Sequence, residues 1–112
     1  MKRFGAVIGV REEKIGEYKR LHAAAWPGVL ATIHECNMRN FSIYLRKLDD
    51  GQHYLFSYFE YVGTDYEADL ARIAADPTTQ RWWALTEICQ SPLANRGPNE
   101  KWASMEEVFH CD

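Results

Sequence analysis

Cysteines are few in this sequence, and none has a neighbour at the spacing of a known cysteine motif. The 112 residues contain Cys36, Cys89 and Cys111, without a C-x-x-C pair. An odd number at these spacings argues against a disulfide framework, a cysteine zinc site and a thioredoxin-type redox pair. We therefore expect three reduced thiols.

Long apolar runs and an excess of basic charge are also missing. No segment approaches the roughly 20 apolar residues that span a bilayer, and the start, "MKRFGAVIGVREEK", has too short an apolar stretch for a secretory signal. The formal net charge is -3, which offers no basic surface to a phosphate backbone. We expect a cytoplasmic protein with neither a nucleic-acid nor a membrane partner.

Motifs that hold nucleotides, metals or nucleophiles are absent too. The seven glycines are dispersed and form neither a G-x-G-x-x-G nor a Walker pattern, and no G-x-S-x-G elbow occurs. His34-Glu35 lacks the second histidine of an H-E-x-x-H zinc motif. We expect His34, His53 and His110 to be surface or hairpin residues rather than metal ligands.

The length of the chain and its 46% hydrophobic residues predict one ordinary globular domain over residues 1–112. Alternating apolar residues predict strands at 3–10, 40–48, 53–62 and 104–110, and helical spacing predicts helices at 12–36, 65–75 and 77–89. Pro27 predicts a kink or restart of the first helix near Trp26. Thr64 and Glu67 have the spacing of a capping box, and Asp76-Pro77 separates the last two helices.

The order β-α-β-β-α-α-β predicts an α+β fold, in which a ferredoxin-like antiparallel sheet carries its helices on one face. The other face of the sheet would then be bare. Because both hairpin strands carry aromatic residues in both registers, that bare face would be costly to expose to water. We therefore expect a homodimer that stacks sheet against sheet.

Three chemically different rings are spaced along the first helical segment. Tyr18, His22 and Trp26 lie four residues apart, which places them along one side of a helix. Such a stripe is more often half-buried packing than a site, but the run Ala23-Ala24-Ala25 leaves room beside the imidazole. An imidazole can exchange a proton at neutral pH, and a nearby phenol can orient it or relay the proton. The pair suits acid/base work on a hydroxyl group.

Two adjacent indoles form the other unusual feature. Successive helical side chains diverge by about 100°, so Trp82 and Trp83 cannot both lie in one narrow stripe. If Leu85 and Ile88 mark the core side, Trp82 falls near it and Trp83 is rotated away. Flat rings beside an acid/base group suit a pyranose, whose C-H faces pack on aromatic rings.

The last predicted strand adds a weaker candidate for acid/base work. Glu106 and Glu107 would point to opposite faces of a strand, so one of them could turn inward. Both could equally be solvated edge-strand charges. One of the two is kept as a second acid/base candidate.

Four segments, "EYKRLHAAAWPGVL", "RNFSIYLR", "TQRWWALT" and "MEEVFH", occur in an order that resembles the L-rhamnose mutarotase family over essentially the whole chain. The resemblance implies a dimeric ferredoxin-like α/β barrel that interconverts the anomers of a 6-deoxy-hexose without a cofactor. L-rhamnose is the expected monosaccharide, and L-fucose is the alternative. 

The resemblance also implies roles for individual residues. His22 would transfer the proton, with Tyr18 or a bound water as the second proton carrier. Tyr18, Trp82 and Trp83 would bind the substrate. We add Trp26, from the same stripe as His22, and Phe41, from the "RNFSIYLR" segment, to the predicted substrate-binding residues. Family members carry tyrosine at the position of Phe41, so this chain lacks a hydroxyl that could meet a sugar oxygen.

Two other functions fit the same fold. Dimeric α+β barrels include small oxygenases that use haem or act on quinols without a cofactor. A non-catalytic dimeric module that binds a small ligand is the second alternative. In that case the aromatic residues would serve only the core and the subunit interface.

Overall fold

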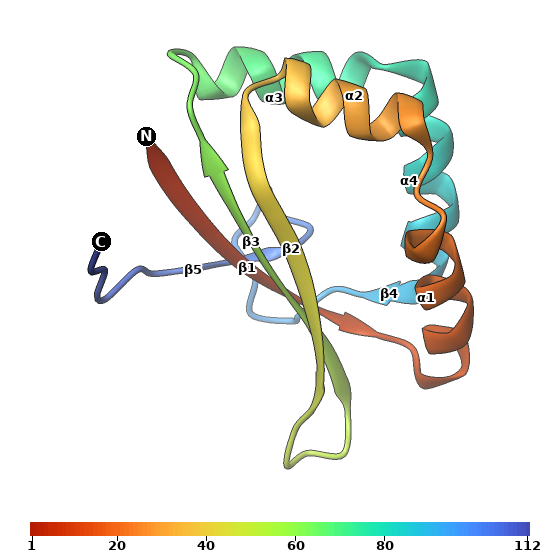
Figure 1. The fold of residues 1–112 in the computed structure, drawn as a ribbon. Coiled ribbons are helices and arrows are strands. Elements are labelled where there is room, and N and C mark those ends of the chain that lie inside the picture. The colour runs from red at the N-terminus through yellow and green to blue at the C-terminus, as the bar shows by residue number, and fades with distance from the viewer.

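Five antiparallel strands form one twisted sheet in the computed structural model, which describes residues 1–112 (Figure 1). The strands are β1 (Lys2–Val10), β2 (Met38–Lys47), β3 (His53–Tyr61), β4 (Gln90–Ser91) and β5 (Ala103–Met105). The sheet order is β2-β3-β1, and the short strands β4 and β5 share the remaining edge of β1. This is the predicted ferredoxin-like arrangement.

The helices lie on one side of the sheet, and the C-terminal segment leaves from the opposite side (Figure 1). They are α1 (Ile15–Ala23), α2 (Pro27–Glu35), α3 (Tyr66–Ala75) and α4 (Pro77–Cys89), with a 3-10 turn at Glu12–Lys14 before α1. None of them is long and apolar enough to cross a bilayer.

The helix boundaries follow the proline and capping residues of the sequence, with one exception. The predicted restart near Trp26 is confirmed, because α1 ends at Ala23 and α2 begins with Pro27 at its first position. The predicted capping box at Thr64 is wrong by one residue. Asp65 is the N-cap of α3, and its carboxylate accepts a hydrogen bond from the backbone N–H of Ala68 at 3.1 Å.

The final strand is much shorter than predicted. Only Ala103–Met105 pairs with β1, whereas a strand at 104–110 was expected. Met105 lies opposite Gly5, so little of β1 remains for further pairing, and Val108 and Phe109 are 87% and 81% exposed. Within one chain, nothing covers these apolar side chains and holds the segment in a strand.

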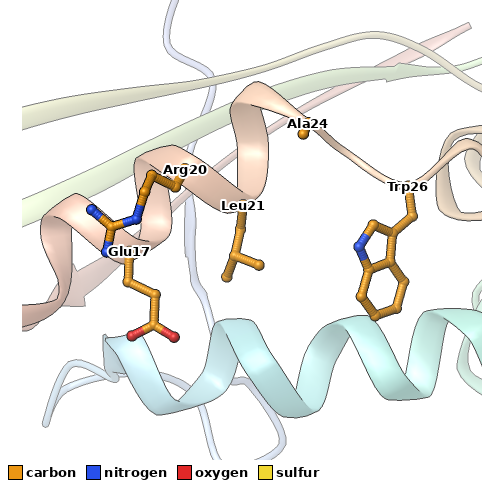
Figure 2. A pocket seen from close by; sticks show the side chains of 5 residues that line it. All are labelled: Glu17, Arg20, Leu21, Ala24 and Trp26. Carbon is orange, nitrogen blue, oxygen red and sulfur yellow. The ribbon is translucent and has the colours of Figure 1, made fainter.

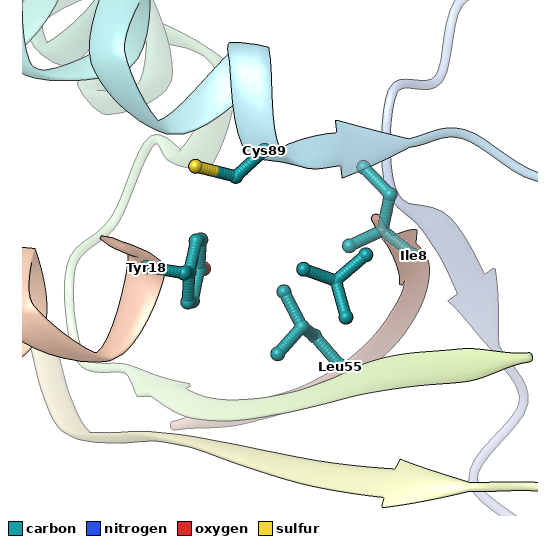
Figure 3. Packing of buried hydrophobic residues seen from close by; sticks show 5 residues of the cluster. Ile8, Tyr18, Leu55 and Cys89 are labelled. Carbon is teal, nitrogen blue, oxygen red and sulfur yellow. The ribbon is translucent and has the colours of Figure 1, made fainter. Parts of the chain in front are cut away.

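The hydrophobic core is divided into two clusters between the sheet and the helices. One contains Ile8, Val10, Leu55, Tyr18 and Cys89, four of which are labelled in Figure 3. The other contains Cys36, Met38 and Ile73, with Phe59 and Tyr66 packed against it. The two clusters lie at different levels of the sheet, because residues 55 and 59 of β3 are four positions apart.

Candidate functional site

A continuous row of aromatic rings connects α1 to α4. The ring centroids of Tyr18 and His22 are 4.2 Å apart in a stacked arrangement. His22 meets Trp82 edge-on at 5.1 Å, and Trp82 meets Trp26 edge-on at 5.3 Å. We call these four residues the α1–α4 row. Trp26 was expected to follow His22 along one helix, but α1 ends at Ala23 and the indole of Trp82 lies between them.

The imidazole of His22 is held in a defined tautomer. Its Nδ1 lies 2.9 Å from the backbone carbonyl oxygen of Tyr18, one helical turn earlier. A carbonyl can only accept a hydrogen bond, so Nδ1 carries the proton and Nε2 retains its lone pair in the neutral ring. The ring is half-buried. Nε2 of His22 is therefore equipped to accept a proton from a bound hydroxyl group.

The phenol of Tyr18 has a different environment from the imidazole that it stacks on. Tyr18 is 6% exposed and belongs to the core cluster of Ile8 and Leu55. Burial raises the pKa of Tyr18 to about 12, although the side chain of Gln90 nearby partly offsets this rise. Tyr18 therefore keeps its proton throughout the physiological pH range. It orients His22 through its ring and its carbonyl group.

The tandem tryptophans diverge as the helical geometry predicts. Trp82 is 6% exposed within the α1–α4 row, whereas Trp83 is 37% exposed. One premise was wrong, because Ile88 is exposed and the buried stripe of α4 instead contains Thr79, Trp82, Thr86 and Cys89. These positions are spaced three and four residues apart, as on one side of a helix. Two of them, Thr79 and Thr86, are polar, whereas an apolar stripe was expected.

Phe41 lies outside the α1–α4 row and belongs to a second aromatic group. A register shift between Arg39 and Ser42, with Asn40 at a φ of 52°, turns Phe41 toward the helix side of the sheet. There it stacks on Phe59 at 5.3 Å, and Phe59 stacks on Phe4 at 5.2 Å. Phe41 is 42% exposed. The structure thus brings four of the five predicted substrate-binding residues to the helices and leaves Phe41 on the sheet.

The C-terminal glutamates lie away from the α1–α4 row. Glu107 is paired with Arg3 at 2.8 Å, and Glu106 is exposed in the segment after β5. Phe4 faces the helices, so Arg3 and its partner lie on the other face of the sheet. Neither glutamate is turned toward the α1–α4 row in the single chain, and a role for one of them as a second acid/base group stays a prediction.

The remaining histidines are placed apart from the row. His34 is exposed at the end of α2, His53 begins β3, and His110 contacts Asp112 at 2.7 Å in the C-terminal segment. No three side chains of His, Cys, Asp or Glu come together in a metal-binding arrangement. Cys36 and Cys89 are buried free thiols, and Cys111 is an exposed one.

A surface hollow of about 260 Å³ lies along α1 and the turn that follows it (Figure 2). It is lined by Glu17, Arg20, Leu21, Ala24 and Trp26, and Figure 2 shows Glu17, Leu21 and Trp26 pointing toward α4. Neither Tyr18 nor His22 lines this hollow. Trp26 is therefore shared between the hollow and the α1–α4 row.

Two buried polar residues on the helix side of the sheet carried no signal in the sequence. Gln90 follows the last residue of α4, is almost fully buried and partly offsets the rise in the pKa of Tyr18. Ser57 lies in the middle of β3 on the helix side of the sheet and is 8% exposed. A lone glutamine at a helix end and a lone serine in an aromatic strand match no motif.

Comparison with protein families supports the resemblance seen in the motifs. The family model described as L-rhamnose mutarotase matches residues 3–111. A protein named L-rhamnose mutarotase from Lactiplantibacillus plantarum is 30% identical over 112 residues, which cover both chains completely. A protein named L-fucose mutarotase from Xanthomonas campestris pv. campestris is 30% identical over 115 residues, covering 97% of this chain and 87% of the relative.

Solved structures share the fold. The crystal structure of an L-rhamnose mutarotase from Formosa agariphila superimposes with a TM-score of 0.74 at 18% identity and covers 100% of both chains. Tetracenomycin F2 cyclase from Streptomyces glaucescens, a type-II polyketide cyclase, gives a TM-score of 0.71 at 14% identity over 100% of this chain and 98% of its own. At these identities the likeness establishes the architecture, a curled antiparallel sheet with helices on one side.

Proposed function

This chain belongs to the L-rhamnose mutarotase family, and we propose that it is an isomerase that interconverts the α and β anomers of L-rhamnose. The match of the family over residues 3–111 carries the assignment. The free Nε2 of His22 within the α1–α4 row supports it chemically. An L-fucose mutarotase among the relatives makes L-fucose the second candidate substrate.

In the proposed reaction, Nε2 of His22 takes the proton of the anomeric hydroxyl group while the bond between the anomeric carbon and the ring oxygen breaks. The ring oxygen receives a proton from the hydroxyl of Tyr18 or from a bound water. The open-chain carbonyl group then rotates, and the ring closes on its other face with both proton transfers reversed. No net proton or electron is consumed. A positioned acid or base typically accelerates such a step by about 10²- to 10⁴-fold.

Aromatic rings surround the sugar in this proposal. Trp82 and Trp26 offer apolar surfaces to the C-H face and to the methyl group of a 6-deoxy-hexose. Trp83 and Phe41, which are partly exposed, would contact the sugar at the margin of the site. Tyr18 would donate a hydrogen bond, since its raised pKa keeps the phenol protonated.

We further propose that the protein is a homodimer that buries the face of the sheet opposite the helices. Support comes from Tyr44, which is 63% exposed on that face, and from Phe56 and Tyr58 beside it on β3. The apolar Val108 and Phe109 of the C-terminal segment add further surface to cover. Light scattering on the purified protein should give twice the 13.0 kDa of one chain.

The cytoplasm is the proposed location. Its support is chemical: the chain has three free cysteines and no disulfide, as is usual where thiols are kept reduced.

Anomer exchange measured by saturation-transfer NMR tests the function directly. The panel should hold L-rhamnose, L-fucose, the pentose L-lyxose and D-hexose controls, each with and without the protein. We expect the largest acceleration with L-rhamnose. Preferred acceleration of L-fucose would reassign the substrate, and exchange rates unchanged for every sugar would refute the proposed activity.

A further inference from the structure

The helix side of the sheet is almost entirely hydrocarbon. We call the side chains of β1, β2 and β3 that point toward the helices the inner face. Its members on the three strands include Phe4, Ala6, Ile8, Val10, Ile43, Leu45, His53, Leu55, Ser57, Phe59 and Tyr61. Only Ser57 and Tyr61 among them carry a hydroxyl group.

The two hydroxyl groups differ in whether the protein uses them. Tyr61 donates to the carboxylate of Asp69 at 2.5 Å and accepts from the backbone N–H of Asp65 at 3.1 Å. Ser57 is 8% exposed, yet its hydroxyl forms no hydrogen bond with any group of the protein. No fully enclosed polar side-chain atom of this chain lacks a hydrogen-bond partner. The Oγ of Ser57 therefore retains some contact with solvent.

Counted from the core cluster that α1 and β3 share, Ser57 and His22 lie at a similar level along their elements. Both α1 and β3 run antiparallel to β1, so they run in the same direction (Figure 1). Tyr18 on α1 and Leu55 on β3 share one core cluster. One helical turn beyond Tyr18, about 6 Å along the axis, is His22. Two residues beyond Leu55, about 7 Å along the strand, is Ser57.

The neighbours of Ser57 leave its hydroxyl accessible. Ala6 lies directly opposite it on β1, and Ile43 lies opposite it on β2. Ala6 contributes only a methyl group, so no large side chain covers Ser57 from that strand. A polar group in such surroundings can form hydrogen bonds to water or to a polar ligand that replaces the water.

We propose that Ser57 positions the sugar by a hydrogen bond from its Oγ to one hydroxyl group of the pyranose, on the side of the ring away from His22. This inference rests on the proposed mutarotase function and adds a specificity-determining residue to it. A site that pairs a sugar hydroxyl discriminates against a sugar that lacks it, because the protein group is then left without a partner. Ser57 acts by orienting the substrate and takes no part in proton transfer.

Ser57→Ala tests the proposal, with Ser42→Ala as the matched control. Ser42 lies on β2, where its side chain points to the other face of the sheet beside Tyr58. Anomer exchange should be measured with L-rhamnose and with analogues that each lack one further hydroxyl group. Loss of one neutral hydrogen bond should lower kcat/KM for L-rhamnose by about 3- to 10-fold, mostly through KM. Ser42→Ala should match the wild type.

The analogues separate a hydrogen bond from a packing effect. For one analogue, which lacks the hydroxyl that Ser57 binds, the wild type and Ser57→Ala should have equal kcat/KM. An equal loss with every analogue, or no loss with L-rhamnose, would refute the role of Ser57 while leaving the mutarotase function intact. A wild-type protein that accelerates no sugar would refute the function itself and this inference with it.

Discussion

Two aromatic groups occupy the space between sheet and helices, and they differ in what their polar atoms do. In the α1–α4 row, Nε2 of His22 has no protein partner and the rings connect two helices. In the second group, which contains Phe4, Phe41, Phe59, Tyr61 and Tyr66, the buried hydroxyl of Tyr61 is bound to Asp69. The first group leaves a proton acceptor unused, whereas the second uses its buried polar atoms internally.

The carboxylate of Asp69, which binds Tyr61, forms further hydrogen bonds within the protein. Asp69 also accepts from the side chain of Asn37 at 3.0 Å and from Arg72 at 2.9 Å. These donors, with Tyr61 the foremost, hold the pKa of Asp69 below its ordinary value. A Cβ on Gly63 would lie 2.4 Å from the Tyr61 hydroxyl, so the loop after β3 can pass over this network only with glycine. Similar stacked rings thus accompany an internal hydrogen-bond network in one place and a free proton acceptor in the other.

The largest effect is expected within the row itself, from Trp82→Ala. The indole is almost fully buried and contacts both His22 and Trp26. Its removal should destabilise the protein by about 3–5 kcal/mol in urea unfolding and should also slow anomer exchange. Trp83→Ala, as the control, should lower the free energy of unfolding by about 1 kcal/mol or less. Equal losses in the two variants would contradict the assignment of Trp82 to the row.

The next effect concerns Tyr18 at alkaline pH. Its folded pKa of about 12 is above the ordinary value of 10.0. The contribution of the protonated Tyr18 phenol to the unfolding free energy is therefore complete below pH 10 and is lost as the pH rises to about 12. Two pKa units correspond to about 2–3 kcal/mol. In Tyr18→Phe the decline of unfolding free energy over this range should be smaller by that amount. An unchanged decline would show that the phenol is not buried in solution.

Tyr61→Phe tests the second group with a smaller change. One donor to Asp69 is lost, so the melting temperature should fall by several degrees while anomer exchange at 25 °C stays at the wild-type rate. On acidification, the variant should also lose less of its own maximal unfolding free energy than the wild type does. The reason is that the lowered pKa of Asp69 depends first on Tyr61. In the wild type, the stabilisation that comes from the ionised Asp69 is present above the ordinary pKa of a carboxyl group and is lost as the pH falls through the lowered pKa of the folded state. A slower anomer exchange with an unchanged melting temperature would contradict this expectation and would assign the second group a chemical role.

The smallest effect is expected from Phe41→Tyr, which sharpens the boundary between the two groups. The ring packs on Phe59 but is 42% exposed. A new hydroxyl at its rim should change the ratio of kcat/KM for L-rhamnose and L-fucose by about 2- to 10-fold, the range of one hydrogen bond. An identical ratio in both proteins would place Phe41 entirely in the second group.

Much of this arrangement can be predicted from local patterns. Strand alternation and helical spacing predict the element order, and Pro27 predicts the restart of α2, because each depends on backbone geometry within a few residues. The stacking of Tyr18 on His22 follows from their spacing of four residues in α1. The divergence of Trp82 and Trp83 follows from the rotation of about 100° per helical residue.

Features that depend on distant parts of the chain could not be predicted. The insertion of Trp82 between His22 and Trp26 requires the packing of α4 on α1 and α2. The shortened β5 depends on how much of β1 is left to pair with. The unused hydroxyl of Ser57 becomes visible only when all its neighbours are placed.

The central claim is that His22 is the proton-transferring residue and not a packed ring of the α1–α4 row. Saturation-transfer NMR of anomer exchange in His22→Ala, with His34→Ala as the control on exposed α2, tests it most directly. We expect His22→Ala to lose 100-fold or more of the acceleration while its melting temperature stays within a few degrees of the wild type, and His34→Ala to remain fully active. A folded His22→Ala protein that exchanges the anomers of L-rhamnose at the wild-type rate would contradict the claim.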